Sequence, residues 1–110
     1  MAAAYHLTIL TPAGTRFNGN AEAMVAHGKE GFVGVLAGHA PMISGLHPGP
    51  LSVTTESGTS WFACGPGVLE ASMGNEVTVL VDEAWPVDSE EEAKEKVEAE
   101  YRAAAHPPTT

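Results

Sequence analysis

Residues 5–81 alternate between apolar and polar side chains in short runs, and this period of two is typical of β-strands with one buried face. The first run places Tyr5, Leu7 and Ile9 on one face, and the last run, 76–81, places three valines on one face. Gly-, Pro- and Asn-containing turn signals recur about every 8–12 residues between the runs, which predicts an all-β sandwich or barrel.

The turn signals divide this region into expected strands. Asn18-Gly19 is a strong hairpin signal, so we expect one strand to end and the next to begin there. The predicted strands cover 5–11, 15–18, 20–27, 32–36, 42–46, 50–55, 59–64, 68–73 and 76–81.

One stretch, Gly31–Gly49, is unusually rich in glycine and proline and organises the rest of the chain. It contains a Gly-His-Ala-Pro corner at 38–41 and a His-Pro-Gly turn at 47–49, with an apolar segment on each side of the corner. Glycine and proline fix the backbone direction at several points here, and the apolar segments require burial. We therefore expect the corner to lie where two sheet layers meet.

The composition becomes more acidic from Asp82 onward, and the pattern of a helix follows from Ser89. Ser89 with Glu92 three residues later is a capping box, and Pro107-Pro108 ends the pattern. We expect one helix of about 17 residues, near 25 Å long. The chain is thus predicted to divide into a β-sandwich domain, residues 1–86, and a C-terminal helix with a short Pro-containing tail, residues 87–110.

The polar face of this helix carries acid–base pairs four residues apart, and its apolar face is narrow. Two of the four apolar residues are alanines, so we expect the helix to be mobile or to lean on the sandwich. The predicted ion pairs are Glu90/Lys94, Glu92/Lys96 and Glu98/Arg102, and the apolar residues are Ala93, Val97, Tyr101 and Ala104.

Composition and charge exclude several classes of partner. The 110 residues carry 5 basic and 14 acidic side chains, a net charge of −9, which argues against nucleic acid and anionic lipid. The single cysteine rules out an internal disulfide framework and fits a reducing compartment. No apolar run approaches the roughly 20 residues that span a bilayer, and the N-terminus lacks the pattern of a signal peptide.

Five histidines make a metal site a hypothesis to consider. His6, His27, His39, His47 and His106 show no H-x-H, H-E-x-x-H or C-x-x-C spacing, so a site would need residues from distant strands. The alternatives for His39 are a ring that bonds the backbone of its own corner, or a contact at a protein interface.

Other candidate chemistry has a simpler structural interpretation. Gly28, Gly31 and Gly34 lie between strands without the following helix that a phosphate loop requires. Cys64 has no neighbouring base and is expected to be a buried thiol, and Glu70 is expected to face solvent. The acidic helix is either a solvated face or a regulatory arm for a basic partner. We expect no catalytic group and no cofactor.

A series of short motifs, in a specific order and spacing from about Tyr5 to Asp88, resembles the epsilon subunit of rotary F-type ATP synthases. The motifs are Tyr5-His-Leu, Thr11-Pro12, Phe17-x-Gly19, Gly28-x-x-Gly31, Gly38-His-Ala-Pro41, Leu46-x-Pro-Gly49, Phe62-Ala63, Gly65-x-Gly-Val-Leu-Glu70 and Val77–Asp82.

The resemblance implies a sandwich of about ten strands followed by a helical portion, with no catalytic role. Such a subunit belongs to the central stalk, where it binds the gamma subunit and the ring of c subunits and couples proton flow to ATP synthesis. By position, Thr11, His39 and Ser44 would face gamma, and Lys29, Glu30, Gly31 and Phe32 would face the c-ring. The chain would then be a peripheral membrane protein on the cytoplasmic face of an energy-transducing membrane, held there through the complex.

Two departures from the family pattern affect these expectations. Phe32 replaces the polar or acidic residue that is usual at the c-ring surface, so the contact is either apolar or Phe32 turns inward. Val87-Asp88 resembles the start of an ATP-binding pattern, but the basic residues of a second C-terminal helix are missing from this sequence. The chain is therefore a short form of the family, which disfavours nucleotide binding and long-reach inhibition of hydrolysis.

Outside this family, a small-ligand or metal-binding β-sandwich module is the alternative. It would require tight zinc or nickel binding that depends on His39 and His47.

Overall fold

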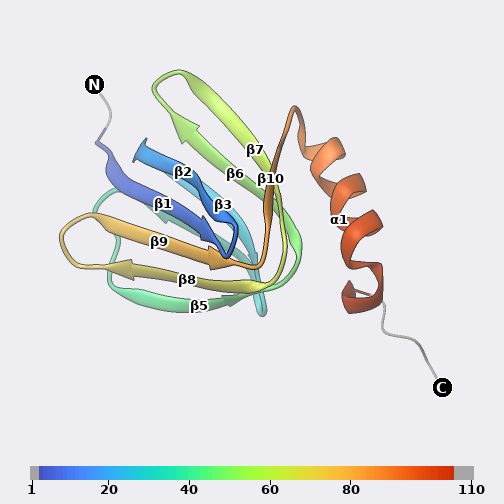
Figure 1. Cartoon of the computed structure of the whole chain (residues 1–110). Coiled ribbons are helices and arrows are strands. Elements are labelled where there is room, and N and C mark those ends of the chain that lie inside the picture. The colour runs from blue at the N-terminus through green and yellow to red at the C-terminus, as the bar shows by residue number, and fades with distance from the viewer. Residues whose placement is uncertain (1–2, 106–110) are drawn as a thin grey trace.

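The computed structural model describes the backbone of residues 3–105 and the side chains of residues 3–101. It shows ten strands followed by one helix, which confirms the predicted mainly-β fold (Figure 1). The division at residues 86 and 87 stays a prediction. The elements are β1 Tyr5–Thr11, β2 Gly14–Ala21, β3 Ala23–Gly28, β4 Gly31–Leu36, β5 Met42–Leu46, β6 Gly49–Thr55, β7 Gly58–Cys64, β8 Gly67–Ser72, β9 Glu76–Val81, β10 Ala84–Val87 and α1 Glu90–Ala105.

The strands form one continuous sheet that folds into two layers. Sheet 1 has the order β2-β1-β9-β8-β5, and sheet 2 has the order β4-β3-β6-β7-β10. The two meet where Gly28 of β3 pairs with Leu46 of β5. Only the pairing of β1 with β9 is parallel among the described strands, and it joins the first strand of the sandwich to one near its end.

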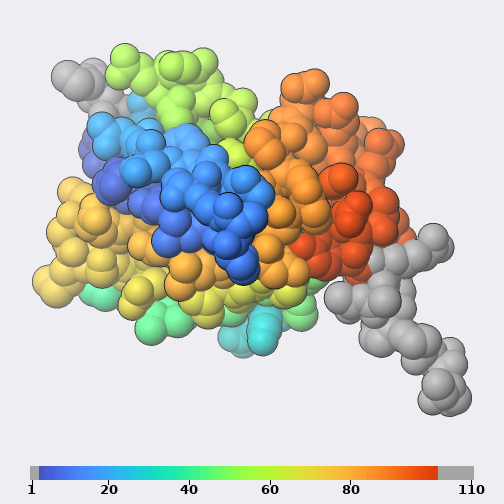
Figure 2. All heavy atoms as spheres, viewed as in Figure 1, coloured from blue at the N-terminus to red at the C-terminus, as the bar shows by residue number. Residues whose placement is uncertain are grey.

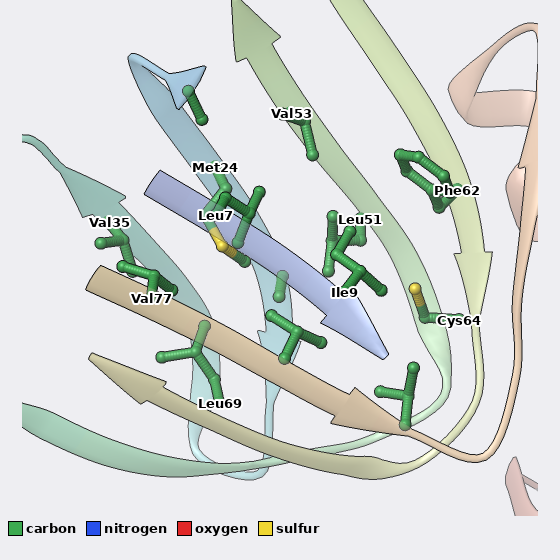
Figure 3. Close-up of a cluster of buried hydrophobic side chains, with 14 of the residues drawn as sticks. Leu7, Ile9, Met24, Val35, Leu51, Val53, Phe62, Cys64, Leu69 and Val77 are labelled. Carbon is green, nitrogen blue, oxygen red and sulfur yellow. The ribbon is translucent and has the colours of Figure 1, made fainter. Parts of the chain in front are cut away.

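The core lies between the layers. Tyr5, Leu7 and Ile9 of β1 are buried, as the alternation predicted, and so are the three valines of β9. Figure 3 shows Leu7 and Ile9 pointing toward side chains of sheet 2, among them Leu51. Alternate residues of both layers therefore fill one apolar interior.

The hairpin predicted at Asn18-Gly19 is wrong. Both residues lie inside β2, where Asn18 pairs with Thr8 of β1, and the chain bends at Glu22 instead. A type I′ turn needs a positive φ at both central residues, and Asn75 is the only described non-glycine residue with one. The predicted strand 20–27 is accordingly divided between β2 and β3.

Strand β10 was not predicted. It has four residues, includes Pro86, and pairs along one edge with β7. Proline cannot donate a hydrogen bond to a strand ladder, so it is tolerated where a strand has a free edge. A strand so short, with a proline inside it, gives little period-two signal.

The helix packs on the outer face of sheet 2, beside β7 and β10 (Figure 1). Ala93 and Val97 are buried against Ala63 of β7, with Trp85 of β10 next to them. Lys96 adds a cation–π contact, since its Nζ lies 4.8 Å from the centre of the Trp85 ring. Of the two expectations for the helix, leaning on the sandwich agrees with this packing, and Figure 2 shows it lying along one side of the molecule.

The two ends of the helix are fixed by different hydrogen bonds. Ser89 Oγ accepts the Glu92 N–H at 3.1 Å, so this half of the predicted capping box is confirmed. Near the other end, the Tyr101 hydroxyl donates to Asp82 Oδ1 at 2.6 Å, where the backbone of Tyr101 departs from helical geometry. Burial, followed by this hydrogen bond to Asp82, raises the pKa of Tyr101.

The predicted ion pairs on the helix form only in part. Glu90 and Lys94 lie 3.9 Å apart, as expected. Lys96 instead pairs with Glu100 at 3.5 Å, and the Glu92 carboxylate accepts the Asp88 N–H at 2.8 Å. The side chains of Arg102 and Ala104, and Pro107-Pro108, lie outside the described residues. Within residues 3–105 no helix has both the length and the apolar character needed to cross a membrane.

Gly65 allows Tyr101 and Asp82 to meet. A Cβ at position 65 would overlap both Asp82 Oδ1 and the Tyr101 hydroxyl. We expect Gly65→Ala to separate this end of the helix from the sandwich and to cost about 1–3 kcal/mol of stability through overpacking. Thermal unfolding and amide exchange over residues 90–101 measure the effect.

Gly19→Ala provides the matched control, because its Cβ would lie 3.7 Å from the nearest atom of Phe17. Equal exchange of the helix amides in the two alanine variants would show that Gly65 is not needed for docking.

Candidate functional site

The tip of the β3–β4 hairpin carries the residues predicted to face a ring of membrane subunits. Lys29 and Glu30 form its two-residue turn, and Gly31 has φ +125°, which favours glycine. The Lys29 N–H donates to Gly45 O at 3.1 Å, and the Lys29 stem passes over Gly45. The tip is therefore held against β5, and in Figure 2 it projects, in cyan, from the lower edge of the sandwich.

Phe32 points outward. Its side chain is 73% exposed, and its ring lies against the His27 ring at 4.6 Å between centres. Ile43 of β5, also 73% exposed, and Phe32 line one shallow hollow of about 350 Å³ next to the hairpin tip. The hollow thus has an apolar component beside the charged groups of Lys29 and Glu30, and the alternative in which Phe32 turns inward is wrong for this structure.

Ser44 lies in the same hollow, although it was predicted to face a different partner from the hairpin tip. It pairs with Leu69 of β8, and its hydroxyl donates to Gly45 O at 3.3 Å. The structure therefore brings Ser44 together with the hairpin residues rather than with Thr11 and His39.

His39 lies in the connection between β4 and β5 and packs against the core. Its ring meets the Tyr5 ring edge-on at 5.6 Å, and its Nδ1 is 3.4 Å from Ala40 O. Its Nε2 is buried and has no hydrogen-bond partner within the described residues. This placement matches the structural alternative for His39, a ring that bonds its own corner, and leaves only part of the ring accessible.

Thr11 lies at the opposite end of β1 from Tyr5 and His39. Its hydroxyl donates to Gly14 O at 3.0 Å and accepts the Ala13 N–H at 3.2 Å, which fixes the β1–β2 turn. Since β1 has seven residues, Thr11 and His39 lie roughly 20 Å apart. A single partner that touches both must extend along sheet 1.

A groove beside Thr11 was not predicted from the sequence. It has a volume of about 620 Å³ and lies where the β1–β2 turn meets the start of β8 and the end of β9. Its lining is mostly apolar, with Asp82 as the acidic group; the residues are Leu10, Thr11, Pro12, Gly14, Thr15, Pro66, Gly67, Leu80, Val81 and Asp82. Three of the family motifs, Thr11-Pro12, Gly65-x-Gly and Val77–Asp82, contribute to it, but they lie far apart in the chain, so their order did not predict a groove.

A cluster of three hydrogen-bonded polar side chains around His6 on sheet 1 was also not predicted. His6 of β1 lies between Glu76 of β9, at 3.1 Å from its Nδ1, and Asn18 of β2, at 2.5 Å from its Nε2. The hydrogen bond to Asn18, then that to Glu76, raises the pKa of His6 above its usual 6.5. The pairing of strands brings these residues together, so neither the order nor the spacing of the sequence reveals them.

Metal and catalytic hypotheses find no support within the described residues. There, no group of three or more His, Cys, Asp or Glu side chains is arranged to hold a metal, and His106 lies outside that part of the chain. Burial, then the charges of Asp82 and Glu83, raises the pKa of Cys64 to about 12, so the thiol is not ionised near neutral pH. Glu70 is exposed to solvent, which confirms the simpler interpretation.

Comparison with known proteins gives consistent results. A family model described as "ATP synthase, Delta/Epsilon chain, beta-sandwich domain" matches residues 4–87. A chain in the cryo-EM structure of the Euglena gracilis mitochondrial ATP synthase (OSCP/F1/c-ring, rotational state 1) is 28% identical, with a TM-score of 0.72. The alignment covers 99% of this chain and 71% of that one.

A second similar chain is in the cryo-EM structure of the Tetrahymena thermophila mitochondrial ATP synthase central stalk and c-ring. It is 20% identical with a TM-score of 0.63, and the alignment covers 76% of this chain and 67% of that one. At this identity the likeness concerns the fold alone.

The His6 cluster predicts a pH dependence of stability. Because the pKa is raised in the folded protein, the stabilisation is complete below the unfolded value near 6.5 and is lost as the pH rises through the folded pKa. The difference in melting temperature between wild type and His6→Gln should therefore be largest near about pH 5 and shrink above about pH 8. Thermal unfolding across this range measures it.

Asn18→Ala tests the assigned cause. The substitution removes the largest contribution to the raised pKa of His6 and leaves Glu76 in place. It should therefore reduce the pH dependence of the stability that His6 contributes. A constant difference between wild type and His6→Gln at every pH would contradict the argument.

Proposed function

The chain belongs to the ATP synthase delta/epsilon family, and on this premise we propose that it is a non-catalytic subunit of the central stalk of a proton-translocating F-type ATP synthase. The observation that carries the proposal is the family match over residues 4–87, which includes every strand of the sandwich. The likeness to a chain of the Euglena complex extends over nearly the whole chain, helix included, and supports it.

In this role the sandwich transmits torque between two partners. Its two layers share one close-packed core and are cross-linked by strand pairing, so the body deforms little under load. We assign the gamma subunit to Thr11, His39 and Ser44, a contact that would extend over sheet 1 and reach the hairpin tip at Ser44. Rotation of the c-ring would then reach gamma, and through it the catalytic head subunits, by way of this body.

The c-ring contact is assigned to the hairpin tip, residues Lys29, Glu30, Gly31 and Phe32. The tip projects from the sandwich, is fixed to β5 by the Lys29–Gly45 hydrogen bond, and presents both charged and apolar groups. These are the properties required of a rigid contact with the polar loops of a membrane ring. The chain would be a peripheral membrane protein on the cytoplasmic face of an energy-transducing membrane, attached only through the complex.

An independent metal-binding module has less support. Among the described residues, no group of three or more His, Cys, Asp or Glu side chains that could hold a metal is found, at His39 and His47 or elsewhere. The ring of His39 is also partly occupied by its contacts with Tyr5 and Ala40.

A charge placed at Ser44 tests the gamma surface. Ser44 is half-buried at the edge of the hollow, and we expect Ser44→Arg to lower the affinity for purified gamma at least about tenfold, or roughly 1.4 kcal/mol. Calorimetric titration measures the affinity, and circular dichroism shows whether the fold is kept. Ser57→Arg, on the exposed β6–β7 turn, is the matched control.

The outcomes separate two levels of the proposal. If Ser44→Arg binds gamma as tightly as Ser57→Arg, the surface is assigned wrongly. If the wild-type chain itself does not bind gamma, the central-stalk role is wrong.

A further inference from the structure

Strand β4 is an edge strand of sheet 2 that is paired with β3 alone. The opposite side of the sandwich, between β2 and β10, is bridged by contacts between the layers. Arg16 and Glu83 form an ion pair at 2.9 Å there, and the Phe17 and Phe62 rings meet edge-on at 6.3 Å. On the β4 side the Tyr5 hydroxyl of β1 donates to Val35 O at 2.9 Å, but no described strand pairs with the outer edge of β4.

The backbone of β4 has unused hydrogen-bonding groups along this edge. Gly28 and Gly31 flank a two-residue turn, and the Leu36 carbonyl accepts the His39 N–H at 3.2 Å, so it points away from β3. Groups two residues apart in a strand point the same way, so those of Phe32 and Gly34 also point to the free edge. Within the described residues, no backbone bond outside the strand ladders engages Gly34.

The usual protections of an edge strand are lacking in β4. Its sequence, GFVGVL, contains no charge and no proline. Phe32 is 73% exposed and Leu36 is 66% exposed, and both lie on the outer face of the sheet. Natural edge strands of this length commonly carry a lysine, a proline or a bulge to prevent pairing with another chain.

The strand is also self-complementary. Gly34 is midway between Phe32 and Leu36, so an antiparallel copy centred on Gly34 would place Phe32 of each chain opposite Leu36 of the other. Gly34 leaves space at the centre, where a Cβ would meet only Met24 O at 3.9 Å. We propose that a second copy of this chain pairs antiparallel with β4 about Gly34, extending sheet 2 across the two molecules.

The two-fold symmetry of this pairing limits it to a dimer. Each copy uses its one free β4 edge, so the contact closes and does not propagate into a fibre. About four new hydrogen bonds would use groups that are otherwise free, together with two Phe32–Leu36 cross-strand contacts.

Charge opposes the dimer and gives it a recognisable salt dependence. Each chain carries a net charge of −9, whereas β4 itself is uncharged. Added salt screens the repulsion between the copies, so the dimer should strengthen as salt rises. A contact held by opposite charges would weaken instead.

The dimer does not depend on the proposed function. Phe32 also belongs to the surface that we assign to the c-ring, so if that assignment holds, the dimer and the c-ring contact exclude one another.

Proline at position 34 tests the pairing directly. Gly34→Pro removes the outward N–H while the bonds to β3 remain, and Gly34→Ala keeps that N–H and is the matched control. In sedimentation equilibrium we expect wild type and Gly34→Ala to dimerise alike, and Gly34→Pro to dimerise at least about tenfold more weakly. The proposal is overturned if wild type stays monomeric up to about 0.5 mM, or if the proline and alanine variants behave alike.

A covalent trap gives a second measurement that does not require the proline variant to fold. Gly34→Cys would place two thiols across the two-fold axis at roughly 5.5 Å between Cα atoms, within disulfide range, while Cys64 is buried. Mild oxidation with diamide should cross-link Gly34→Cys at least about tenfold faster than Ser57→Cys on the far turn. Equal rates for the two variants would refute the pairing.

Discussion

The parallel pairing of β1 with β9 is the interaction on which the rest of the structure depends. It joins the first strand of the sandwich to one near its end, and the buried faces of both strands lie at the centre of the core. Since β9 continues through Asp82 into β10 and the helix, the same pairing sets where α1 docks. The order in which the elements unfold should follow from this. The helix can detach while the sandwich stays folded, but the sandwich cannot stay folded without β1.

The sandwich that results is asymmetric, and this asymmetry leaves one side of it for contacts with other subunits. The helix covers part of the outer face of sheet 2, and Arg16 with Glu83 bridges one side. The opposite side retains the projecting hairpin tip and the free edge of β4, with Phe32 exposed beside them. A monomer with this much exposed apolar surface on one side is suited to a place between other subunits.

Local alternation was enough to predict most strands, because a half-buried strand must place apolar residues at every second position. It predicted the burial of Tyr5 and of the β9 valines. It failed at Asn18-Gly19, where strand pairing with β1 overrides a local turn signal, and at β10, where Pro86 removes the pattern. Contacts between distant segments, such as Tyr101 with Asp82, left no local signal.

The candidate sites were less predictable than the fold. The motif resemblance supplied residue positions but not their surroundings, so Ser44 was grouped with His39 although it lies beside the hairpin tip. The groove beside Thr11 and the cluster around His6 exist only because β1, β2 and β9 are adjacent.

The central claim, that the chain is part of the rotor, is tested most directly by affinity purification of the tagged chain from detergent-solubilised native membranes. Mass spectrometry then identifies the proteins that are retained with it. The account predicts that gamma and the c-ring subunit are recovered together with the catalytic head, and recovery of the chain alone or with unrelated soluble proteins would contradict it.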